Sequence, residues 1–401
     1  MTTQKTNVPK LRFPQFTDAW ERCRLGEVVE IKMGQSPSSK NYTNNPNDYI
    51  LVQGNADIKN GWVSPRVWTT EITKLANKNS LILSVRAPVG DVAKTNYDVV
   101  LGRGVASLNG NEFIYQTLIK LKIDGYWERL SSGSTFESIN SNDLKDAEIF
   151  LPTKQEQTTI GNFFRQIDEL ITLRQRELEH TKELKKGLLQ KMFPKNGETV
   201  PQIRFPQFTD AWERCRLGDV GETFSGLSGK TKDDFGHGNA KYITYLNVCK
   251  NHIADLSEVG LIEIDAKQEA VKYGDVLFTT SSETPEEVGM SSVWLGNIDN
   301  VYLNSFCFGY RPNIEFNPYY LGSVLRSPSI RRNIVLLAQG ISRYNISKKK
   351  MMDIEIPIPT LEEQTTIGNF FRQIDELITL RQRELEHTRQ LKRALLQQMF
   401  V

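Results

Sequence analysis

The chain has 401 residues, of which 39% are hydrophobic and 24% are charged, a size that excludes a single small domain and suits two or three ordinary ones. Its 50 basic and 48 acidic residues nearly balance, so bulk charge alone does not indicate a nucleic-acid partner. No apolar run approaches the roughly 18 residues that span a bilayer, and the polar N-terminus lacks the apolar region of a secretory signal. The four cysteines form no C-x-x-C pair, so we expect a cytoplasmic protein with reduced thiols and no membrane partner.

The chain repeats two of its own segments. Residues 12–26 (RFPQFTDAWERCRLG) recur letter for letter at 204–218, an offset of 204 minus 12, or 192. Residues 156–181 (EQTTIGNFFRQIDELITLRQRELEHT) recur at 363–388, an offset of 363 minus 156, or 207. Each half therefore consists of a short leading segment (11–26 or 203–218), a variable stretch and a long charged segment.

The variable stretches, residues 27–151 and 219–358, mix short β-rich runs with Gly, Pro, Asn and Ser turns. This pattern indicates an α+β module in each half. Strands are expected at 80–85, 98–101, 242–248, 275–280 and 301–308, and helices near 113–123 and 318–325.

The charged segment at 154–193 places its apolar residues on one alternating four-three ladder, which is typical of a long helix with a packing seam. Thr153 and Glu156 predict a capping box at its start, in which the hydroxyl accepts a first-turn N–H and the carboxylate reaches back to the cap N–H. Thr360 and Glu363 repeat this pattern before the second copy.

A long helix with one apolar stripe must bury that stripe, and the other copy offers an identical one. We therefore expect the helices to pair antiparallel, with Arg174 and Lys185 on the seam setting the register. An open alternative is that each helix lies on its own domain. The expected packing residues are Ile160, Phe164, Ile167, Ile171, Leu178, Leu188, Ile367, Phe371, Ile374, Ile378, Leu385 and Leu395.

The sequence thus predicts an α+β fold with two globular mixed domains separated by a pair of long antiparallel, coiled-coil-like helices, related by pseudo-two-fold symmetry. The domains are expected at 1–152 and 194–360, and the helices at 153–193 and 361–401.

Enzymatic interpretations find little support. Residues 226–231 (GLSGKT) resemble a phosphate loop, but Phe224 occupies the position where its first glycine is required. The four histidines form no H-E-x-x-H pair, and no compact acid-acid-lysine group occurs in both halves. We therefore expect no catalytic residue and no metal site, and an autonomous nuclease is the least favoured alternative.

Nearly identical helices joined to unlike modules predict that constant surfaces bind one kind of partner twice, whereas the variable surfaces bind two different things. If the ligand is a duplex, its natural target is an asymmetric pair of half-sites a fixed distance apart. Neither variable stretch is basic overall, so only a limited rim of phosphate contacts is expected.

Several phrases resemble those of the specificity subunits of type I restriction-modification systems, and the resemblance covers nearly the whole chain. In the first half they are 34–37 (GQSP), 84–90 (SVRAPVG), 101–104 (LGRG) and 131–135 (SSGST) before 149–153 (IFLPT). In the second half they are 226–231, 274–280 (GDVLFTT), 304–306 (NSF) and 339–343 (QGISR) before 356–360 (IPIPT).

The resemblance implies two target-recognition domains on double-stranded DNA, separated by the helix pair. It also implies two modification subunits, which bind S-adenosylmethionine and methylate an adenine in each half-site, and restriction subunits in the full complex. The present chain would catalyse nothing and hold no cofactor, and it contains no N-P-P-[FY] tetrapeptide. Alternatives are a specificity protein of a related system with fused modification and cleavage parts, and an adaptor scaffold that binds only proteins.

Polar and arginine side chains within the first domain's phrases are the expected DNA contacts, because base edges and phosphates are bound by hydroxyl, amide and guanidinium groups. They are Gln35, Ser36, Ser38, Arg86, Arg103, Ser134 and Thr135. Arg86 alternatively braces its own turn, and Gly102 and Gly104 are expected to meet backbone requirements.

The second domain's expected DNA contacts are Ser228, Lys230, Thr231, Thr279, Ser281, Arg343, Tyr344, Lys348, Lys349 and Lys350. Arg343 presents a fork that fits guanine O6 and N7 or a phosphate. The basic run at 348–350 is expected to bind phosphate, with plain solvation as the alternative. Because Arg86 and Arg103 have no charged counterparts in the second module, the two half-sites should differ.

Overall fold

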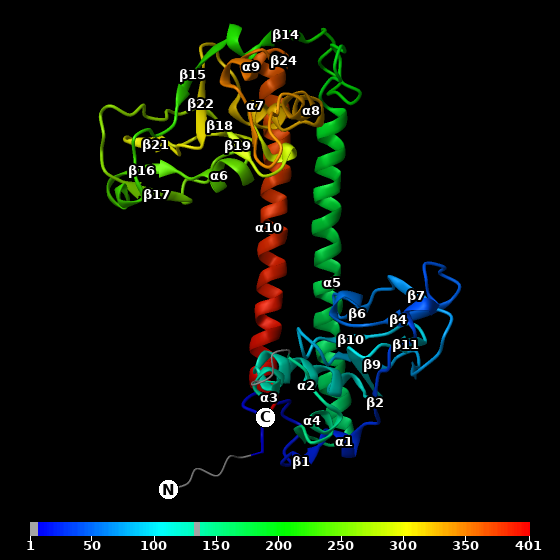
Figure 1. Cartoon of the computed structure of the whole chain (residues 1–401). Helices are drawn as coiled ribbons and strands as arrows, with labels where there is room; N and C mark the ends of the chain where they lie inside the picture. Colours follow the sequence, from blue (N-terminus) through cyan, green and yellow to red (C-terminus); the bar gives the residue numbers. More distant parts are fainter. Residues whose placement is uncertain (1–6, 132–136) are drawn as a thin grey trace. The chain divides into compact units, whose positions relative to one another are not determined.

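The computed structural model describes residues 7–131 and 137–401 (Figure 1). The chain divides into two compact units, one formed by residues 1–176 and 382–401 and the other by residues 177–381. Both long helices, α5 (Lys154–Lys191) and α10 (Leu361–Met399), contribute a segment to each unit.

The first unit contains two main sheets (Figure 1). The larger sheet has the order β2-β12-β9-β10-β6-β5, in which only β10 and β6 are parallel neighbours. Its strands are β2 (Ile31–Met33), β5 (Ile58–Lys59), β6 (Trp62–Val63), β9 (Leu81–Ser84), β10 (Val92–Lys94) and β12 (Val105–Leu108). The smaller sheet, β3-β7-β4-β11-β8, consists of β3 (Tyr42–Thr43), β4 (Tyr49–Val52), β7 (Val67–Thr69), β8 (Leu75–Ala76) and β11 (Val99–Leu101).

Short helices and one two-stranded ladder complete the first unit. The ladder pairs β1 (Glu21–Arg24) with β13 (Glu148–Leu151), so the repeated leading segment closes the domain next to the start of α5. The helices are α1 (Leu25–Val28), η1 (Ser39–Asn41), η2 (Asn55–Asp57), α2 (Glu112–Ile123), α3 (Tyr126–Ser131) and α4 (Ser141–Lys145).

The second unit also contains two main sheets, but each has fewer strands, and it has two two-stranded ladders instead of one. A four-stranded sheet contains β15 (Gly221–Ser225), β22 (Cys307–Pro312), β18 (Val276–Thr279) and β20 (Ser291–Val293), in that order. A three-stranded sheet contains β17 (Val259–Ile262), β16 (Phe235–Ile243) and β21 (Val301–Leu303). Two ladders pair β14 (Glu213–Arg216) with β24 (Glu355–Ile358), and β19 (Ser281–Ser282) with β23 (Tyr344–Asn345). The helices are η3 (Leu217–Asp219), η4 (Lys232–Asp234), α6 (Tyr245–Lys250), η5 (Pro285–Glu287), α7 (Pro318–Leu325), α8 (Pro328–Leu336) and α9 (Lys348–Met352).

Two expected strands of the second module are wrong in detail. The strand expected at 242–248 ends at Ile243, because the Thr244 hydroxyl accepts the Asn247 N–H at 3.2 Å and begins α6. The strand expected at 301–308 is two strands, β21 and β22, separated by a turn at 304–306. The helix expected at 318–325 is α7, whose bounds are the same.

Each unit buries an aromatic cluster that joins its domain to both long helices. In the first unit, Trp20 and Phe113 pack with Phe164 of α5 and with Phe400, which directly follows α10. The rings of Phe113 and Phe400 are stacked with centroids 5.0 Å apart. Large aromatic side chains contribute much of the apolar area that such a core removes from water.

The second unit repeats this cluster with Trp212, Tyr320, Phe193 and Phe371. Phe193 and Phe371 are stacked with centroids 5.8 Å apart. Each helix therefore packs both on a domain and on the other helix, so the two alternatives left open by the sequence each describe part of the structure.

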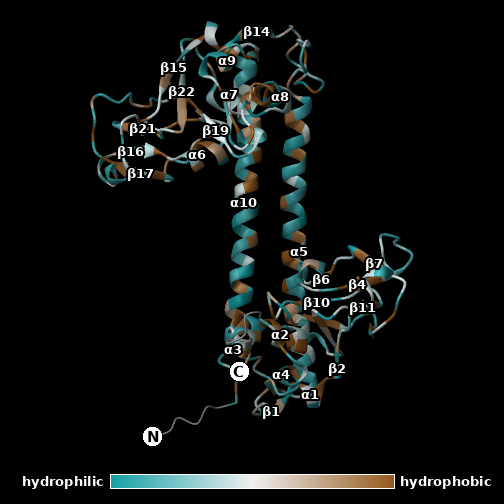
Figure 2. Ribbon diagram, viewed as in Figure 1, coloured by the Kyte–Doolittle hydropathy of each residue, from teal (hydrophilic) through white to brown (hydrophobic). Residues whose placement is uncertain are grey.

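The helices run antiparallel within each unit. In the first unit, Asp168 of α5 binds Lys392 of α10 at 2.6 Å, whereas Arg174, further along α5, binds the earlier Thr388. Arg174 also donates to the Glu384 carbonyl oxygen at 2.7 Å. Figure 2 shows that both helices are largely hydrophilic with hydrophobic positions recurring along them.

The second unit makes the same contacts with the two helices exchanged. Arg381 of α10 binds Thr181 and donates to the Glu177 carbonyl oxygen at 2.7 Å. Lys185 of α5 binds Asp375 of α10 at 2.5 Å. Identical sequences thus form reciprocal contacts. Arg174 and Lys185 bind the other helix across a seam that also contains the polar residues Asp168, Thr181, Asp375 and Thr388.

The expected capping box forms only in part. Thr153 accepts the Glu156 N–H at 3.4 Å, but the buried Glu156 carboxylate does not turn back to the cap. It instead accepts two hydrogen bonds of 2.7 Å from Arg12. A bidentate guanidinium is a stronger partner than a backbone amide, so the leading segment determines where this carboxylate lies.

Candidate nucleic-acid interface

Three expected contact residues of the first domain line one concavity of about 300 Å³. Ser36, Arg86 and Arg103 lie there with polar residues that the sequence did not single out. The complete lining is Ser36, Tyr42, Gln53, Gly54, Asn55, Arg86, Ala87, Arg103 and Gly104.

The sheet brings the two arginines together. β9 and β12 are antiparallel with Ser84 opposite Val105, and the Val85 N–H donates to the Gly104 carbonyl oxygen at 2.9 Å. Arg86 follows Val85 and Arg103 precedes Gly104, so this hydrogen bond brings the two arginines to the same end of the β9–β12 pair. The Arg103 N–H also donates to the Ser36 hydroxyl at 3.1 Å, which holds the third loop beside them.

Close backbone contacts require glycine in these loops. A Cβ at Gly104 would lie 2.1 Å from the Gln53 carbonyl oxygen, and one at Gly34 would lie 2.1 Å from the Gly102 carbonyl oxygen. The expectation that Gly102 and Gly104 serve the backbone agrees with these contacts, because a Cβ at Gly102 would lie 3.0 Å from the Gln53 Cα.

The guanidiniums of Arg86 and Arg103 are exposed and form no hydrogen bond or ion pair with the residues at 7–131 and 137–401. Arg66 of the same domain provides a contrast, because its Nε donates to the buried Asp57 carboxylate at 2.9 Å. The backbone of Arg86 forms an isolated bridge with Ser138, but that contact leaves the guanidinium free.

Gln53 is a polar member of the concavity that sequence reasoning missed. It directly follows the buried strand β4, its N–H donates to Asp57 at 2.7 Å, and its side-chain amide donates to the Tyr42 hydroxyl at 2.8 Å. A polar residue at the end of a buried strand, next to Gly54, was the available signal.

Other expected residues of the first domain lie outside the lining of this concavity. Gln35 is exposed, and its carbonyl oxygen accepts the Thr73 hydroxyl. Ser38 is exposed and its N–H donates to Glu71 at 2.8 Å, a hydrogen bond that lowers the pKa of this carboxyl. Ser134 and Thr135 lie outside the residues that the structure describes.

The corresponding loops of the second domain carry no arginine pair. β18 and β22 place Thr279 opposite Cys307, and the Thr280 N–H donates to the Phe306 carbonyl oxygen at 2.9 Å. The next positions along this register, which correspond to the two arginines, are Ser281 and Ser305.

Four expected contacts of the second domain have structural roles. Thr279 and Ser281 are buried, and the Thr279 hydroxyl accepts the Met290 N–H at 2.9 Å, so these two residues do not form a free surface. Lys230 forms a 2.8 Å ion pair with Asp265, and the pKa of Asp265 is lowered to about 2 by this ammonium and by nearby amide donors. Thr231 binds Asp234 through its N–H and hydroxyl and thereby begins η4.

Other expected residues of the second domain stay at the surface. Ser228 is exposed, although its N–H donates to Gln268 at 3.0 Å. The Arg343 guanidinium is exposed and lies 5.6 Å from the ring of Phe306, which is 54% exposed. Tyr344 is half-buried in β23.

The basic run begins α9. Lys348 donates to the Ser225 hydroxyl at 2.7 Å, whereas Lys349 and Lys350 are exposed and form no ion pair with any residue that the structure describes. An exposed ammonium without a carboxylate partner is free to bind a phosphate.

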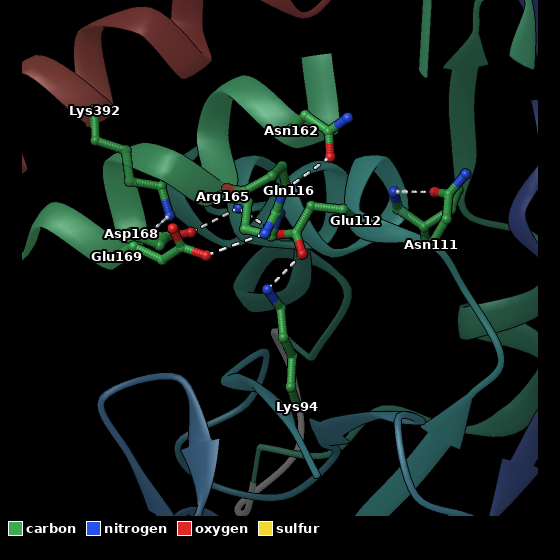
Figure 3. Close-up of polar contacts among 10 residues, drawn as sticks. Lys94, Asn111, Glu112, Gln116, Asn162, Arg165, Asp168, Glu169 and Lys392 are labelled. Atoms are coloured by element: carbon green, nitrogen blue, oxygen red, sulfur yellow. Dashed lines mark hydrogen bonds and ion pairs between the residues drawn. The ribbon is translucent and has the colours of Figure 1, made fainter. Parts of the chain in front are cut away.

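A polar network fills the junction between the first domain and the helix pair (Figure 3). Gln116 donates to Glu112 at 3.0 Å and to Asp168 at 2.8 Å, and Lys94 binds the same Glu112 at 2.5 Å. Burial lowers the pKa of Lys392, although Asp168 favours its charged form. Lys94, Glu112, Asp168 and Lys392 border a cavity of about 960 Å³. Its lining also includes Trp62 and Leu173 but not the buried Gln116.

The expected seam residues divide into buried and half-buried positions. Ile160, Phe164, Leu178, Ile367, Phe371 and Leu385 are buried, and Ile167, Ile171, Leu188, Ile374, Ile378 and Leu395 are half-buried. Near the end of α10 the structure buries Leu396 more deeply than Leu395, because Leu396 faces the aromatic cluster of the first unit.

Three exposed leucines recur at matching positions of the two long helices, and α10 has a further exposed leucine, Leu361, at its start. Leu170, Leu173 and Leu184 of α5 have the exposed counterparts Leu377, Leu380 and Leu391 in α10. Of these matched leucines, Leu170, Leu173 and Leu391 belong to the first unit, and Leu377, Leu380 and Leu184 belong to the second.

Two negative findings apply to residues 7–131 and 137–401. His, Cys, Asp and Glu side chains there form no group that could hold a metal ion. Within the same residues, no helix combines the length and apolar character needed to cross a membrane.

Comparison with known proteins gives consistent results. The family described as "Type I restriction modification DNA specificity domain" matches residues 17–183 and 209–388. A stretch of 190 residues is 32% identical to the MjaX type I restriction enzyme specificity subunit of Methanocaldococcus jannaschii, and the match spans 45% of this chain and 44% of that relative. The MjaVIII type I restriction enzyme specificity subunit of the same organism is 20% identical over 98% of this chain and 95% of its own length.

Solved structures share the fold. The S subunit of a type I restriction-modification system from M. genitalium matches with a TM-score of 0.59 and 17% identity, covering 98% of this chain and 99% of that one. A second chain, from a structure concerned with complex assembly and conformational transition of the type I R-M system, has a TM-score of 0.58 and 18% identity and covers 94% of this chain and 96% of that one.

Proposed function

Because the chain belongs to the type I restriction-modification DNA specificity family, we propose that its two domains read the two unlike halves of one bipartite DNA target. The first recognition domain is residues 1–152 and the second is residues 194–360. The helix pair sets the distance between the half-sites and leaves the intervening base pairs unread.

The observation that carries this proposal is the contrast between constant and variable contacts. The helix contacts of Arg174 and Arg381 are the same in both units, whereas the loop positions of Arg86 and Arg103 hold Ser281 and Ser305 in the second domain. A repeated scaffold with unlike loops suits a target whose halves differ in sequence.

The exposed leucines favour two equal docking faces for modification subunits. Exposed leucines recur at matching positions of two nearly identical helices, and exposed apolar side chains that gather on one surface commonly mark a protein partner. In this proposal one modification subunit binds each face, and the restriction subunits bind the assembled complex.

The chain itself performs no chemistry in this proposal. Its domains hold the DNA register, and the modification subunits bind S-adenosylmethionine, take an adenine out of the stack and methylate it. Specificity protein and methyltransferase thus divide recognition and catalysis between two polypeptides.

The test is to co-express the chain with its modification subunit and to map methylated adenines across the host genome. The proposal expects one asymmetric motif with two specified halves and an unspecified spacer. A single large copurifying partner with both methylation and cleavage activity would identify the related fused system. Absence of salt-dependent duplex binding by the complex would favour a protein adaptor, and metal-dependent DNA cutting by the isolated chain would favour a nuclease.

A further inference from the structure

We infer that Arg86 and Arg103 form a guanine-reading pair, which binds the major-groove edge of the half-site recognised by the first domain, with Gln53 beside it placed to bind adenine. This inference rests on the proposed function and names the bases that the first domain reads.

The backbone register is the first argument. The antiparallel pairing of β9 and β12 is followed by the hydrogen bond between Val85 and Gly104, so Arg86 and Arg103, which flank this hydrogen bond, lie beyond the same end of the two strands. Arg86 and Arg103 both line the same concavity, whose volume is about 300 Å³.

The electrostatic cost of this arrangement is the second argument. Two like charges that border one small concavity repel each other, and neither guanidinium has a carboxylate partner among the described residues. The domain contains carboxylates that could neutralise an arginine, as Asp57 does for Arg66. Two unpaired arginines at one concavity are therefore explained by a ligand that offers acceptors from outside.

Guanine is the base that provides those acceptors. Its major-groove edge carries O6 and N7, which match the two parallel N–H groups of a guanidinium, whereas cytosine offers a donor there. A DNA phosphate would also bind an arginine, so a test must distinguish a contact with guanine from a contact with phosphate.

Gln53 is held in one orientation by its own hydrogen bonds. Its amide N–H donates to the Tyr42 hydroxyl at 2.8 Å, and its backbone is held by Asp57, so the side chain is restrained before any ligand binds. The amide retains its oxygen acceptor and a second N–H donor, the combination that binds N6 and N7 of adenine. Asn55 adds another amide to the same lining.

The second domain lacks this arginine pair, so the inference applies only to the first domain. Its register-equivalent positions hold Ser281 and Ser305, and the exposed Arg343 lies on another loop over the ring of Phe306. A half-site dominated by an arginine pair is therefore expected only for the first domain.

The experiment uses the complete complex with its modification subunits and duplexes that carry the mapped target. Each guanine of the first half-site is replaced in turn by 7-deazaguanine, which lacks the N7 acceptor, and dissociation constants are measured for the natural chain and for Arg86→Ala, Arg103→Ala and Lys145→Ala. Lys145 is the matched control, because it is exposed in α4 of the same domain, has no ion-pair partner among the described residues and does not line the concavity.

Each alanine variant is expected to bind the natural duplex about 5- to 150-fold more weakly, corresponding to the loss of one bidentate base contact. The natural chain should bind two of the 7-deazaguanine duplexes more weakly, one for each arginine. Replacing the corresponding arginine by alanine should cause no further loss of affinity on that duplex. Lys145→Ala should retain the affinity of the natural chain.

Arg86→Lys and Arg103→Lys separate base contact from phosphate contact. A lysine preserves the charge but not the fork, so base reading predicts lost discrimination at one position with an unchanged salt dependence. Equal weakening on every duplex by the alanine variants, or full specificity in the lysine variants, would overturn the inference, as would a first half-site without guanine. A natural complex that gives no bipartite motif would instead overturn the proposed function.

Discussion

Lys392 of α10 donates a 2.6 Å hydrogen bond to Asp168 of α5, and this ion pair joins the two helices within the first unit. Gln116 donates to the same carboxylate at 2.8 Å, so one aspartate connects both helices to the domain. The second unit has the corresponding pair Lys185 and Asp375.

A charge exchange tests this pair. Asp168→Lys places two ammonium groups together at a half-buried position and should lower the free energy of unfolding by about 3 kcal/mol. Adding Lys392→Asp should restore most of that loss, although Gln116 loses its acceptor. Urea unfolding of the four proteins gives the coupling energy, and simple additivity of the two single changes would contradict the assignment.

Glu156 and Glu363 offer a matched comparison of two buried ion pairs. Both accept bidentate bonds from an arginine, but Glu363 also accepts the Trp212 indole N–H at 3.0 Å, whereas the equivalent Trp20 indole N–H has no partner among the described residues.

We expect Glu156→Ala to cost about 3 kcal/mol of unfolding free energy, because it leaves a mostly buried guanidinium unpaired. Glu363→Ala should cost about 1 kcal/mol more, the contribution of one further hydrogen bond to a charged group. Chemical unfolding measures both. Equal losses would show that the Trp212 contact contributes nothing.

The second unit should be more sensitive to acid than the first. His252 Nε2 lies 3.1 Å from Asp375. In the first unit the equivalent aspartate, Asp168, accepts a hydrogen bond from Gln116 instead. Burial lowers the pKa of His252, and the charges of Lys185 and Arg326 act in the same direction, although Asp375 opposes them.

A histidine whose folded pKa lies below its unfolded value of about 6.5 binds fewer protons when folded, so stability is full above that value and falls as pH decreases through the folded pKa. Burial alone would raise the pKa of Asp375, but the hydrogen bond and charge of His252 and the charge of Lys185 hold it below its usual value. Its contribution to stability is therefore lost only at still lower pH.

His252→Gln should remove the decline that begins near neutral pH, because glutamine donates a hydrogen bond without titrating. Unfolding free energies measured from pH 7.5 to pH 5 test this, with the natural chain as reference. An unchanged pH profile in the variant would contradict the prediction.

The repeated leucines should control partner binding without affecting the fold. Leu173 is 52% exposed and its counterpart Leu380 is 53% exposed, so Leu173→Arg and Leu380→Arg should leave the unfolding free energy nearly unchanged. Each change should remove one modification subunit from the purified complex, and the double variant should remove both. Mass measurement of the complexes counts the subunits, and full occupancy in the double variant would exclude these faces.

Replacing glycine by alanine should lower stability in a crowded loop and raise it on an open helix surface. A Cβ at Gly34 would lie 2.1 Å from the Gly102 carbonyl oxygen, so Gly34→Ala should displace the loop beside the concavity and cost about 1–3 kcal/mol. Gly187 of α5 has no neighbouring atom within 4 Å and is matched in α10 by Ala394, so Gly187→Ala should add about 1 kcal/mol. Thermal unfolding distinguishes them, and destabilisation by Gly187→Ala would contradict this account.

Local sequence patterns predicted part of the candidate site. Arg86, Arg103 and Ser36 stand in glycine-containing phrases, and the structure brings all three to one concavity. The ion pair of Lys230 could not be predicted, because its partner, Asp265, is distant in sequence and an ion pair across that separation leaves no local pattern.

Burial was the other source of error. Thr279 and Ser281 carry hydroxyl groups suited to DNA, but they belong to β18 and β19 and lie inside the second domain. Gln53 and Tyr42 were not predicted, because no local sequence pattern marks them. They join the concavity through a tertiary contact in which Gly104 lies against the Gln53 backbone.

Two equivalent long helices, and the side chains that make the same contact twice, could be predicted from the amino-acid sequence, because helical periodicity is local and identical segments obey the same geometry. Which loop side chains meet could be seen only in the folded chain. The arginines, Gln53 and Ser36 come from different strand ends, and their meeting depends on sheet register and backbone close approach, which are properties of the folded chain.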